Sequence, residues 1–225
     1  MGTLVTHQDL DMLSWLGRHR FASVPQVARW TRRPVKVAYR RLAALRQLDL
    51  VAYERPTLHH GVYVATRAGL RVAGLELPTA TVDIRCFHHD RAVLDLALDL
   101  GEEGEVLVTE REMRHADEAA VRAKERPTYG VALPARGGVH YPDLAVELDT
   151  GRIRAVEVER TAKNRARLER ILAGYARARH VAEVVYYVPG ARVGDHVTRT
   201  ARSVGAETVV SVVTWPGWGR LPEAV

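Results

Sequence analysis

The sequence has little of several features that mark particular protein classes. It contains one cysteine, Cys86, which excludes a disulfide-stabilised scaffold and a zinc site built from several cysteines. No apolar run approaches the roughly 20 residues that span a bilayer, and the N-terminal segment lacks the apolar core of a signal peptide. These absences predict a protein that makes no membrane contact and works in a reducing, cytoplasmic setting.

Motifs of several enzyme classes are absent as well. The sequence has no phosphate-binding P-loop and no dinucleotide-binding glycine fingerprint. It also lacks the Gly-x-Ser-x-Gly nucleophile motif and the His-Glu-x-x-His zinc motif. No internal repeat and no low-complexity tract occurs. Any chemistry must therefore come from a less common arrangement of side chains.

Charge is the first informative feature. The 225 residues are 47% hydrophobic and 27% charged, an ordinary globular composition, with a formal net charge of +6. Residues 1–80 hold 12 basic and 5 acidic side chains, a net of +7, and residues 81–225 hold 21 and 22, a net of −1. Phosphate binding requires such a local basic field. The first third of the chain therefore favours a nucleic-acid partner.

The first eighty residues predict three helices followed by two strands. Hydroxyl residues open the first two helices, at Thr6 and Ser23, and apolar residues at helical spacing predict a third helix over about 34–48. Two β-like runs follow, at 50–53 and 61–65. This order, with the strand end Ala65-Thr66-Arg67-Ala68-Gly69, resembles the winged helix-turn-helix superfamily. We therefore expect a DNA-binding domain over residues 1–78.

The resemblance implies that the third helix enters the major groove of double-stranded DNA. Basic residues crowd its start and exposed side, and one more lies in the wing, between the two β-like runs. The expected DNA contacts are Arg32, Arg33, Lys36, Arg40, Arg41 and Arg55. The alternatives are a solvated basic helix, or a winged helix used for protein contacts. Many winged-helix proteins dimerise to read two half-sites, so a homodimer is one arrangement left open.

The rest of the chain alternates between helical and strand patterns after a short linker. Helices are predicted over about 86–100, 161–179 and 193–204, and residues 110–138 read as a partly helical insertion. Strands are predicted at 105–109, 141–148, 152–159, 181–188 and 207–214. The chain is thus expected to be α+β, with a three-layer α/β/α domain around a mixed sheet over residues 82–225.

Carboxylates gather on two consecutive predicted strands. Because side chains alternate along a strand, Glu157 and Glu159 share one face. A three-residue loop at 149–151, with Gly151 in the left-handed conformation, would place Asp143 opposite Glu157, whereas a two-residue loop would place it opposite Val158. Carboxylates held that close suit Mg²⁺ or Mn²⁺, which can activate water and stabilise charge on a phosphodiester. The alternative is strand-edge charges paired with nearby arginines: Arg152, Arg154 and Arg160.

The Pro142-Asp143 pair, the acidic strand about fourteen residues later and the order of elements resemble the PD-(D/E)XK nuclease superfamily over roughly residues 86–188. The resemblance implies that Asp143 and Glu157 bind a metal ion, with Asp95 on the preceding helix as a further ligand. Glu159 replaces the expected lysine, as in some metal-dependent restriction endonucleases, and Lys163 is the candidate for the missing positive charge. This departure puts catalysis, rather than fold, in question.

The winged helix, the Pro-Asp pair and the Glu-x-Glu-x-Thr segment, followed by an arginine-rich helix ending near Tyr175, together resemble the replication-relaxation family. Its members occur on actinobacterial plasmids and integrative elements. The resemblance implies a role in replication or transfer of such elements and does not establish cleavage. The leading hypothesis is a DNA-binding protein whose nuclease-like domain nicks or cleaves DNA using Mg²⁺ or Mn²⁺. The alternative is a non-catalytic regulator or accessory protein that uses the nuclease-like fold for dimerisation or DNA contacts.

Overall fold

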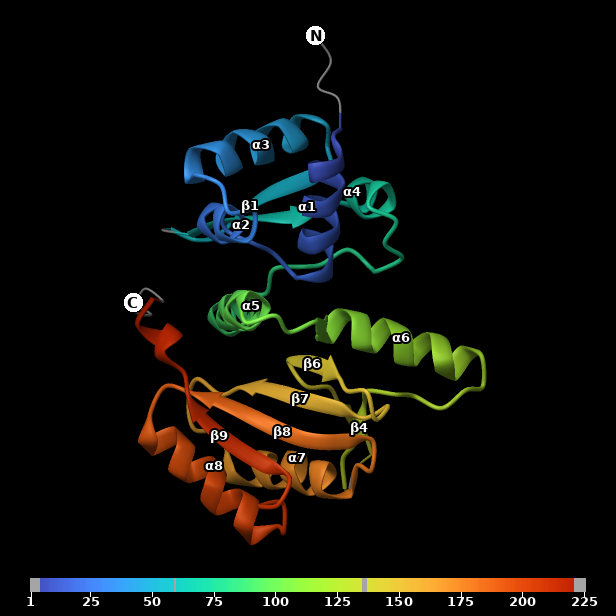
Figure 1. The fold of residues 1–225 in the computed structure, drawn as a ribbon, viewed down its shortest axis with the longest axis vertical. Coiled ribbons are helices and arrows are strands. Elements are labelled where there is room, and N and C mark those ends of the chain that lie inside the picture. Colours follow the sequence, from blue (N-terminus) through green and yellow to red (C-terminus); the bar gives the residue numbers. More distant parts are fainter. Residues whose placement is uncertain (1–4, 59, 135–136, 221–225) are drawn as a thin grey trace. The chain divides into compact units, whose positions relative to one another are not determined.

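In the computed structural model (Figure 1), residues 5–58, 60–134 and 137–220 are described. The chain forms two compact units, Met1–Asp99 and Leu100–Val225. Within the described ranges, no helix is both long and apolar enough to cross a membrane. The N-terminal unit is mainly α-helical with a small sheet, and the C-terminal unit is α/β with a larger mixed sheet. The predicted α+β class is therefore confirmed.

The N-terminal unit begins with the predicted order of helices and strands. It comprises α1 (His7–Arg18), α2 (Val24–Trp30), α3 (Val35–Gln47), the antiparallel strands β1 (Val51–Thr57) and β2 (His60–Ala65), and α4 (Arg67–Val72). Capping boxes at Thr6 and Ser23 satisfy the first amides of α1 and α2, as the sequence predicts. Leu13, Leu16 and Leu42 are fully buried in the core that joins α1 to α3.

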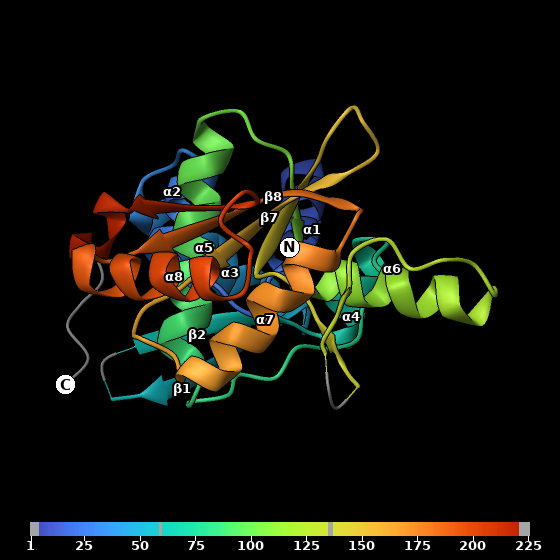
Figure 2. The ribbon, with the colours of Figure 1, turned by 90° about the horizontal axis from the view of Figure 1, so that it is seen from below.

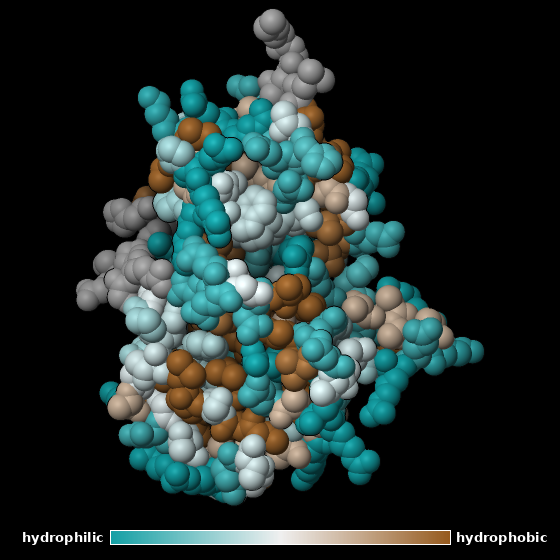
Figure 3. Space-filling model, viewed as in Figure 1, coloured by the Kyte–Doolittle hydropathy of each residue, from teal (hydrophilic) through white to brown (hydrophobic). Residues whose placement is uncertain are grey.

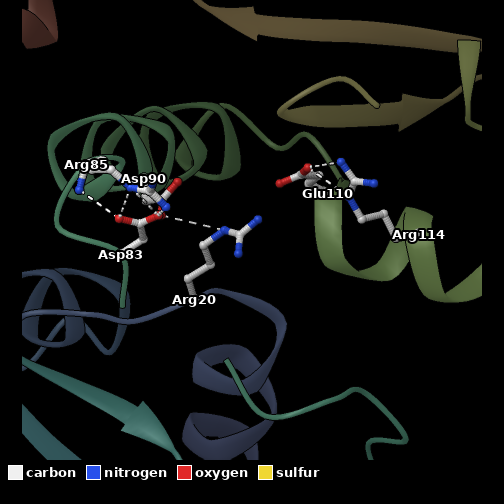
Figure 4. Close-up of polar contacts among 6 residues, drawn as sticks. All are labelled: Arg20, Asp83, Arg85, Asp90, Glu110 and Arg114. Atoms are coloured by element: carbon white, nitrogen blue, oxygen red, sulfur yellow. Dashed lines mark hydrogen bonds and ion pairs between the residues drawn. The ribbon is translucent and has the colours of Figure 1, made fainter. Parts of the chain in front are cut away.

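Helix α5 (Phe87–Glu102) begins within this unit. The ring of Phe87 stacks on that of Phe21 with centroids 5.0 Å apart, and Gln26 Nε2 donates to Asp95 Oδ1 at 2.9 Å. Figure 4 shows Arg20 beside Asp90, with Nε and Oδ2 separated by 3.6 Å. The compact N-terminal unit includes α5 as far as Asp99, and the domain limits expected at residues 78 and 82 stay a prediction.

A five-stranded mixed sheet forms the centre of the C-terminal unit. Its strand order is β3-β6-β7-β8-β9, antiparallel from β3 to β7 and parallel from β7 to β9. Its strands are β3 (Leu107–Thr109), β6 (Leu144–Glu147), β7 (Ile153–Val158), β8 (Val181–Val188) and β9 (Val210–Thr214). Apolar residues on both faces of β7 and β8 make these central strands buried, as expected for the parallel part of a sheet.

Two helices cover one face of this sheet. Figures 1 and 2 show α7 (Arg165–Arg177) and α8 (Ala191–Ser203) side by side against it. Helix α7 starts at 165 rather than 161 because the Asn164 side chain accepts the Ala166 amide and caps it there. A short 3₁₀ helix, η1 (Pro216–Arg220), follows β9.

The predicted partly helical insertion is confirmed. It contains α6 (Glu110–Arg122), capped by Thr109, and a two-stranded ladder of β4 (Val131–Ala132) and β5 (Val139–His140). The Glu110–Arg114 ion pair on α6 appears in Figure 4. Buried Asp117 accepts the amides of residues 128–130 and so fixes the loop that leads to β4. The insertion thereby places His140, the last residue of β5, beside the acidic strand β7.

Candidate functional site

The β6–β7 hairpin decides how the acidic residues meet. Leu144 pairs with Val156 and Glu147 with Ile153, and the Leu148 amide donates to the Arg152 carbonyl. The loop is therefore the three-residue one, and Gly151 has a φ of 72°, in the left-handed region that glycine adopts without strain. Continued by one pair, this register places Asp143 opposite Glu157. The three-residue alternative is confirmed.

Asp143 lies immediately before β6 and reaches across the hairpin. Its Oδ2 accepts the amide of Val158 at 2.7 Å. The carboxylate thus binds the backbone at the point where β7 ends. Asp143 is half-buried, and its charge acts on the other acidic groups of the cluster.

Glu157 is the most enclosed of the acidic side chains, at 2% exposure. Its Oε1 lies 2.6 Å from His140 Nε2 and accepts the Tyr175 hydroxyl at 2.5 Å. Burial by itself would raise its pKa, but the charges of His140 and Lys163 and these hydrogen bonds hold the pKa of Glu157 below its ordinary value. In turn, although burial opposes it, Glu157 raises the pKa of His140. Both shifts favour the charged forms of the two side chains.

Glu159 is also buried, and the ammonium of Lys163 contacts its Oε2. Burial raises the pKa of Glu159, and the charges of Glu157 and Asp143 add to that effect against the opposing charge of Lys163. Burial would lower the pKa of Lys163, but the surrounding carboxylates raise it. Lys163 therefore lies directly on Glu159, and the catalytic role expected of its positive charge stays a prediction.

Three further side chains lie among these acidic residues although the sequence did not predict them as part of the site. They are His140, Tyr175 and Tyr186. Tyr186 is paired with Glu157 in the β7–β8 register, is fully buried, and its hydroxyl has no hydrogen-bond partner among the described residues. Burial, and then the charge of Glu157, raise the pKa of Tyr186 well above its ordinary value. The hydroxyl is thus a neutral donor. We call these residues, with Asp143, Glu157, Glu159 and Lys163, the acidic cluster.

Two of the three arginines considered as alternative partners, Arg152 and Arg154, bond elsewhere. Arg154 pairs with Glu105, at 2.7 Å, and with Glu183, while Arg152 donates to the Val181 carbonyl. These bonds tie neighbouring strands together. The acidic residues are neutralised instead by the lysine and histidine described above.

The donor set can be compared with what a divalent ion requires. Mg²⁺ and Mn²⁺ prefer several oxygen ligands around one point. The carboxylates have suitable chemistry, but one oxygen of each is already bound: that of Glu159 by Lys163, that of Glu157 by His140 and Tyr175, and that of Asp143 by a backbone amide. Among the described residues no three His, Cys, Asp or Glu side chains are grouped for a metal ion. Asp95, the third expected ligand, bonds Gln26 in the N-terminal unit. As placed, the side chains do not fit the predicted ion, and the cofactor stays a prediction.

Five of the six predicted DNA contacts lie on α3 or on the two residues before its N-cap, and the sixth, Arg55, lies on β1. Arg32, Arg33, Lys36 and Arg40 are exposed, and none has a carboxylate partner within the described ranges. Figure 3 shows mostly hydrophilic side chains over the region that α3 occupies in Figure 1. Arg55 is exposed on β1. The structure therefore presents five of the six predicted basic residues to solvent without an internal ion pair.

Arg41 differs from the others. Both its Nε and Nη2 donate to the carboxylate of Asp9, a residue of α1 with 0% exposure. Asp9 also accepts the amide and hydroxyl of Thr6 in the α1 capping box. Arg41 thus fixes α3 against α1. A shallow groove of about 640 Å³ lies beside this pair, between the start of α1 and the first two turns of α3.

Sequence comparison adds one finding. The family described as Replication-relaxation matches residues 13–186, a stretch that includes both α3 and the acidic cluster. No curated protein matches the chain, and no solved structure matches it.

Proposed function

The chain belongs to the replication-relaxation family, and on that premise we propose that it is a DNA-binding protein of plasmid or mobile-element replication, with α3 docking on duplex DNA. The family assignment supports the replication theme. The single observation that carries DNA binding is the group of exposed, unpaired basic side chains at the start of α3. A net charge of +7 on residues 1–80 would attract the polyanion before contact.

The first prediction tests α3 directly. Replacing Arg33, Lys36 and Arg40 together by alanine should weaken duplex binding and lower the slope of log affinity against log salt by about 2.7, since each neutralised phosphate contributes about 0.9. Fluorescence anisotropy over a salt series measures both quantities. The charge-matched control removes three exposed arginines of α8: Arg192, Arg199 and Arg202. Equal slopes for the two triple variants would contradict the assignment of α3.

For the C-terminal unit we propose a non-catalytic role, in which the acidic cluster stabilises the β6–β7 hairpin. This is supported by its bonds: each carboxylate has a protein donor, and Lys163 and His140 offset the charge. A second candidate is a metal-dependent nuclease. The register favours it, because Asp143 and Glu157 lie opposite each other as that fold would require.

The second prediction separates these candidates. Incubated with supercoiled plasmid and Mg²⁺ or Mn²⁺, the unchanged chain and its Asp143→Ala variant should leave the plasmid equally intact, because Lys163 and His140 compete with an ion for the carboxylates. Gel electrophoresis of nicked and linear products measures the outcome. Nicking by the unchanged chain that disappears in Asp143→Ala would establish the nuclease instead.

A further inference from the structure

The first turns of α3 carry two apolar side chains that are more than half exposed to solvent. Val35 is 54% exposed and Tyr39 is 56% exposed. The two residues are four apart, so their side chains lie one above the other on the same strip of the helix. Val37 is less exposed, at 38%, and faces the groove beside α1 instead. Val35 and Tyr39 therefore form a small apolar strip that no described part of the chain covers; we call it the α3 apolar strip.

The surroundings of the strip restrict what can cover it. Lys36 and Arg40 each follow one of its residues and lie about 100° further around the helix, while Arg32 and Arg33 lie just before the helix. An apolar protein surface placed there would leave these cations desolvated and unpaired, which is costly. The partner must combine dense negative charge at its edges with small apolar groups between them.

Duplex DNA has this combination in its major groove. Phosphates line the two edges, and the C5-methyl group of thymine is the apolar feature that the four bases present there. A helix that enters the groove points its N-terminal side chains at base edges. Valine is short and has no hydrogen-bonding group, so it can contribute to base readout only through contact with such a methyl group.

We propose that Val35 and Tyr39 contact thymine methyl groups and so make DNA binding by this chain sequence-specific, with thymine required at the positions they face. This rests on the proposed DNA-binding function of α3. The basic residues around the strip bind phosphate and set the position of the helix, whereas the α3 apolar strip selects the sequence.

The third prediction tests this with a chemical deletion of the methyl group. The full chain is first used to select duplexes from a pool with 20 random base pairs, and each thymine of the enriched site is then replaced singly by deoxyuridine. At the contacted positions the unchanged chain should bind about fourfold more weakly, the equivalent of one buried methyl group. The Val35→Ala and Tyr39→Ala variants should each lose this sensitivity at one position.

Matched variants make the result specific. Tyr39→Phe keeps the ring and should keep the sensitivity, and Val121→Ala, a valine on α6 with 60% exposure, should behave like the unchanged chain. Binding and enrichment with no deoxyuridine effect would overturn the inference while leaving the proposed function intact. Duplex binding without enrichment of any site would also overturn the inference, whereas failure to bind duplex would overturn the proposed function itself. Light scattering in which Val35→Ala and Tyr39→Ala convert a dimer to a monomer would overturn the inference in favour of a second copy of the chain.

Discussion

Replacing Arg41 by alanine should lower the free energy of unfolding of the N-terminal unit by about 3 kcal/mol, the cost of leaving a buried charge without its partner. Asp9 has 0% exposure, so in the folded unit its carboxylate depends on donors from the protein. Among the described residues, Thr6 then supplies the remaining donors to the Asp9 carboxylate, through its amide and its hydroxyl. Urea unfolding followed by the fluorescence of Trp15 and Trp30, which stack in this unit, measures the change.

A double variant separates the structural role of Arg41 from the DNA contact predicted for it. Asp9→Leu combined with Arg41→Met removes both charges, and such apolar replacements of buried ion pairs are often neutral for stability. If Arg41 only holds α3 in place, the double variant should recover DNA affinity together with stability. If it recovers stability but binds as weakly as Arg40→Ala, Arg41 contacts phosphate. An Arg41→Ala variant as stable as Arg33→Ala would contradict the structural role.

Replacing Lys163 by methionine should destabilise the C-terminal unit by a similar amount, about 3 kcal/mol. The change leaves Glu159 buried at 3% exposure with no cation on it, while the charges of Glu157 and Asp143 remain nearby. Methionine keeps the length of the side chain, so the loss reflects charge more than packing. Thermal or urea unfolding of the purified variant measures it.

The chain offers a matched control for this lysine. Lys124 is exposed in the turn after α6, and Lys124→Met should leave stability within about 0.5 kcal/mol of the original, as surface changes usually do. Adding Glu159→Gln to Lys163→Met should restore most of the loss, because the uncompensated charge is then absent. A Lys163→Met variant as stable as Lys124→Met would show that Glu159 is neutral or solvated in the folded protein.

Local patterns in the sequence were enough for much of the fold. The caps at Thr6 and Ser23 and the alternation along β7 depend on residues within a few positions of one another, so they were correct. The hairpin register was reduced to two alternatives, and the conformation of Gly151 decided between them. The meeting of Glu157 with Glu159 and Lys163 follows from the same local spacing.

The parts that the sequence did not reveal depend on distant contacts. Tyr175 donates to Glu157 only because α7 packs against the sheet. Tyr186 lies beside Glu157 only because β8 pairs in parallel with β7. His140 comes from the far end of an insertion. Arg41 has the same local pattern as its neighbours on α3, yet its partner is 32 residues away on α1. Spacing along the chain carries no information about such pairs.

The loop at 149–151 has a consequence for how this protein can vary in length. Side chains on a strand alternate with a period of two, so adding or deleting one loop residue exchanges the two faces of β6 relative to β7. Asp143 would then leave the side of Glu157, and the buried residues of β6 would turn to the opposite face. Replacing an amino acid in this loop affects the structure only locally. Changing the number of loop residues instead changes the register of β6 against β7.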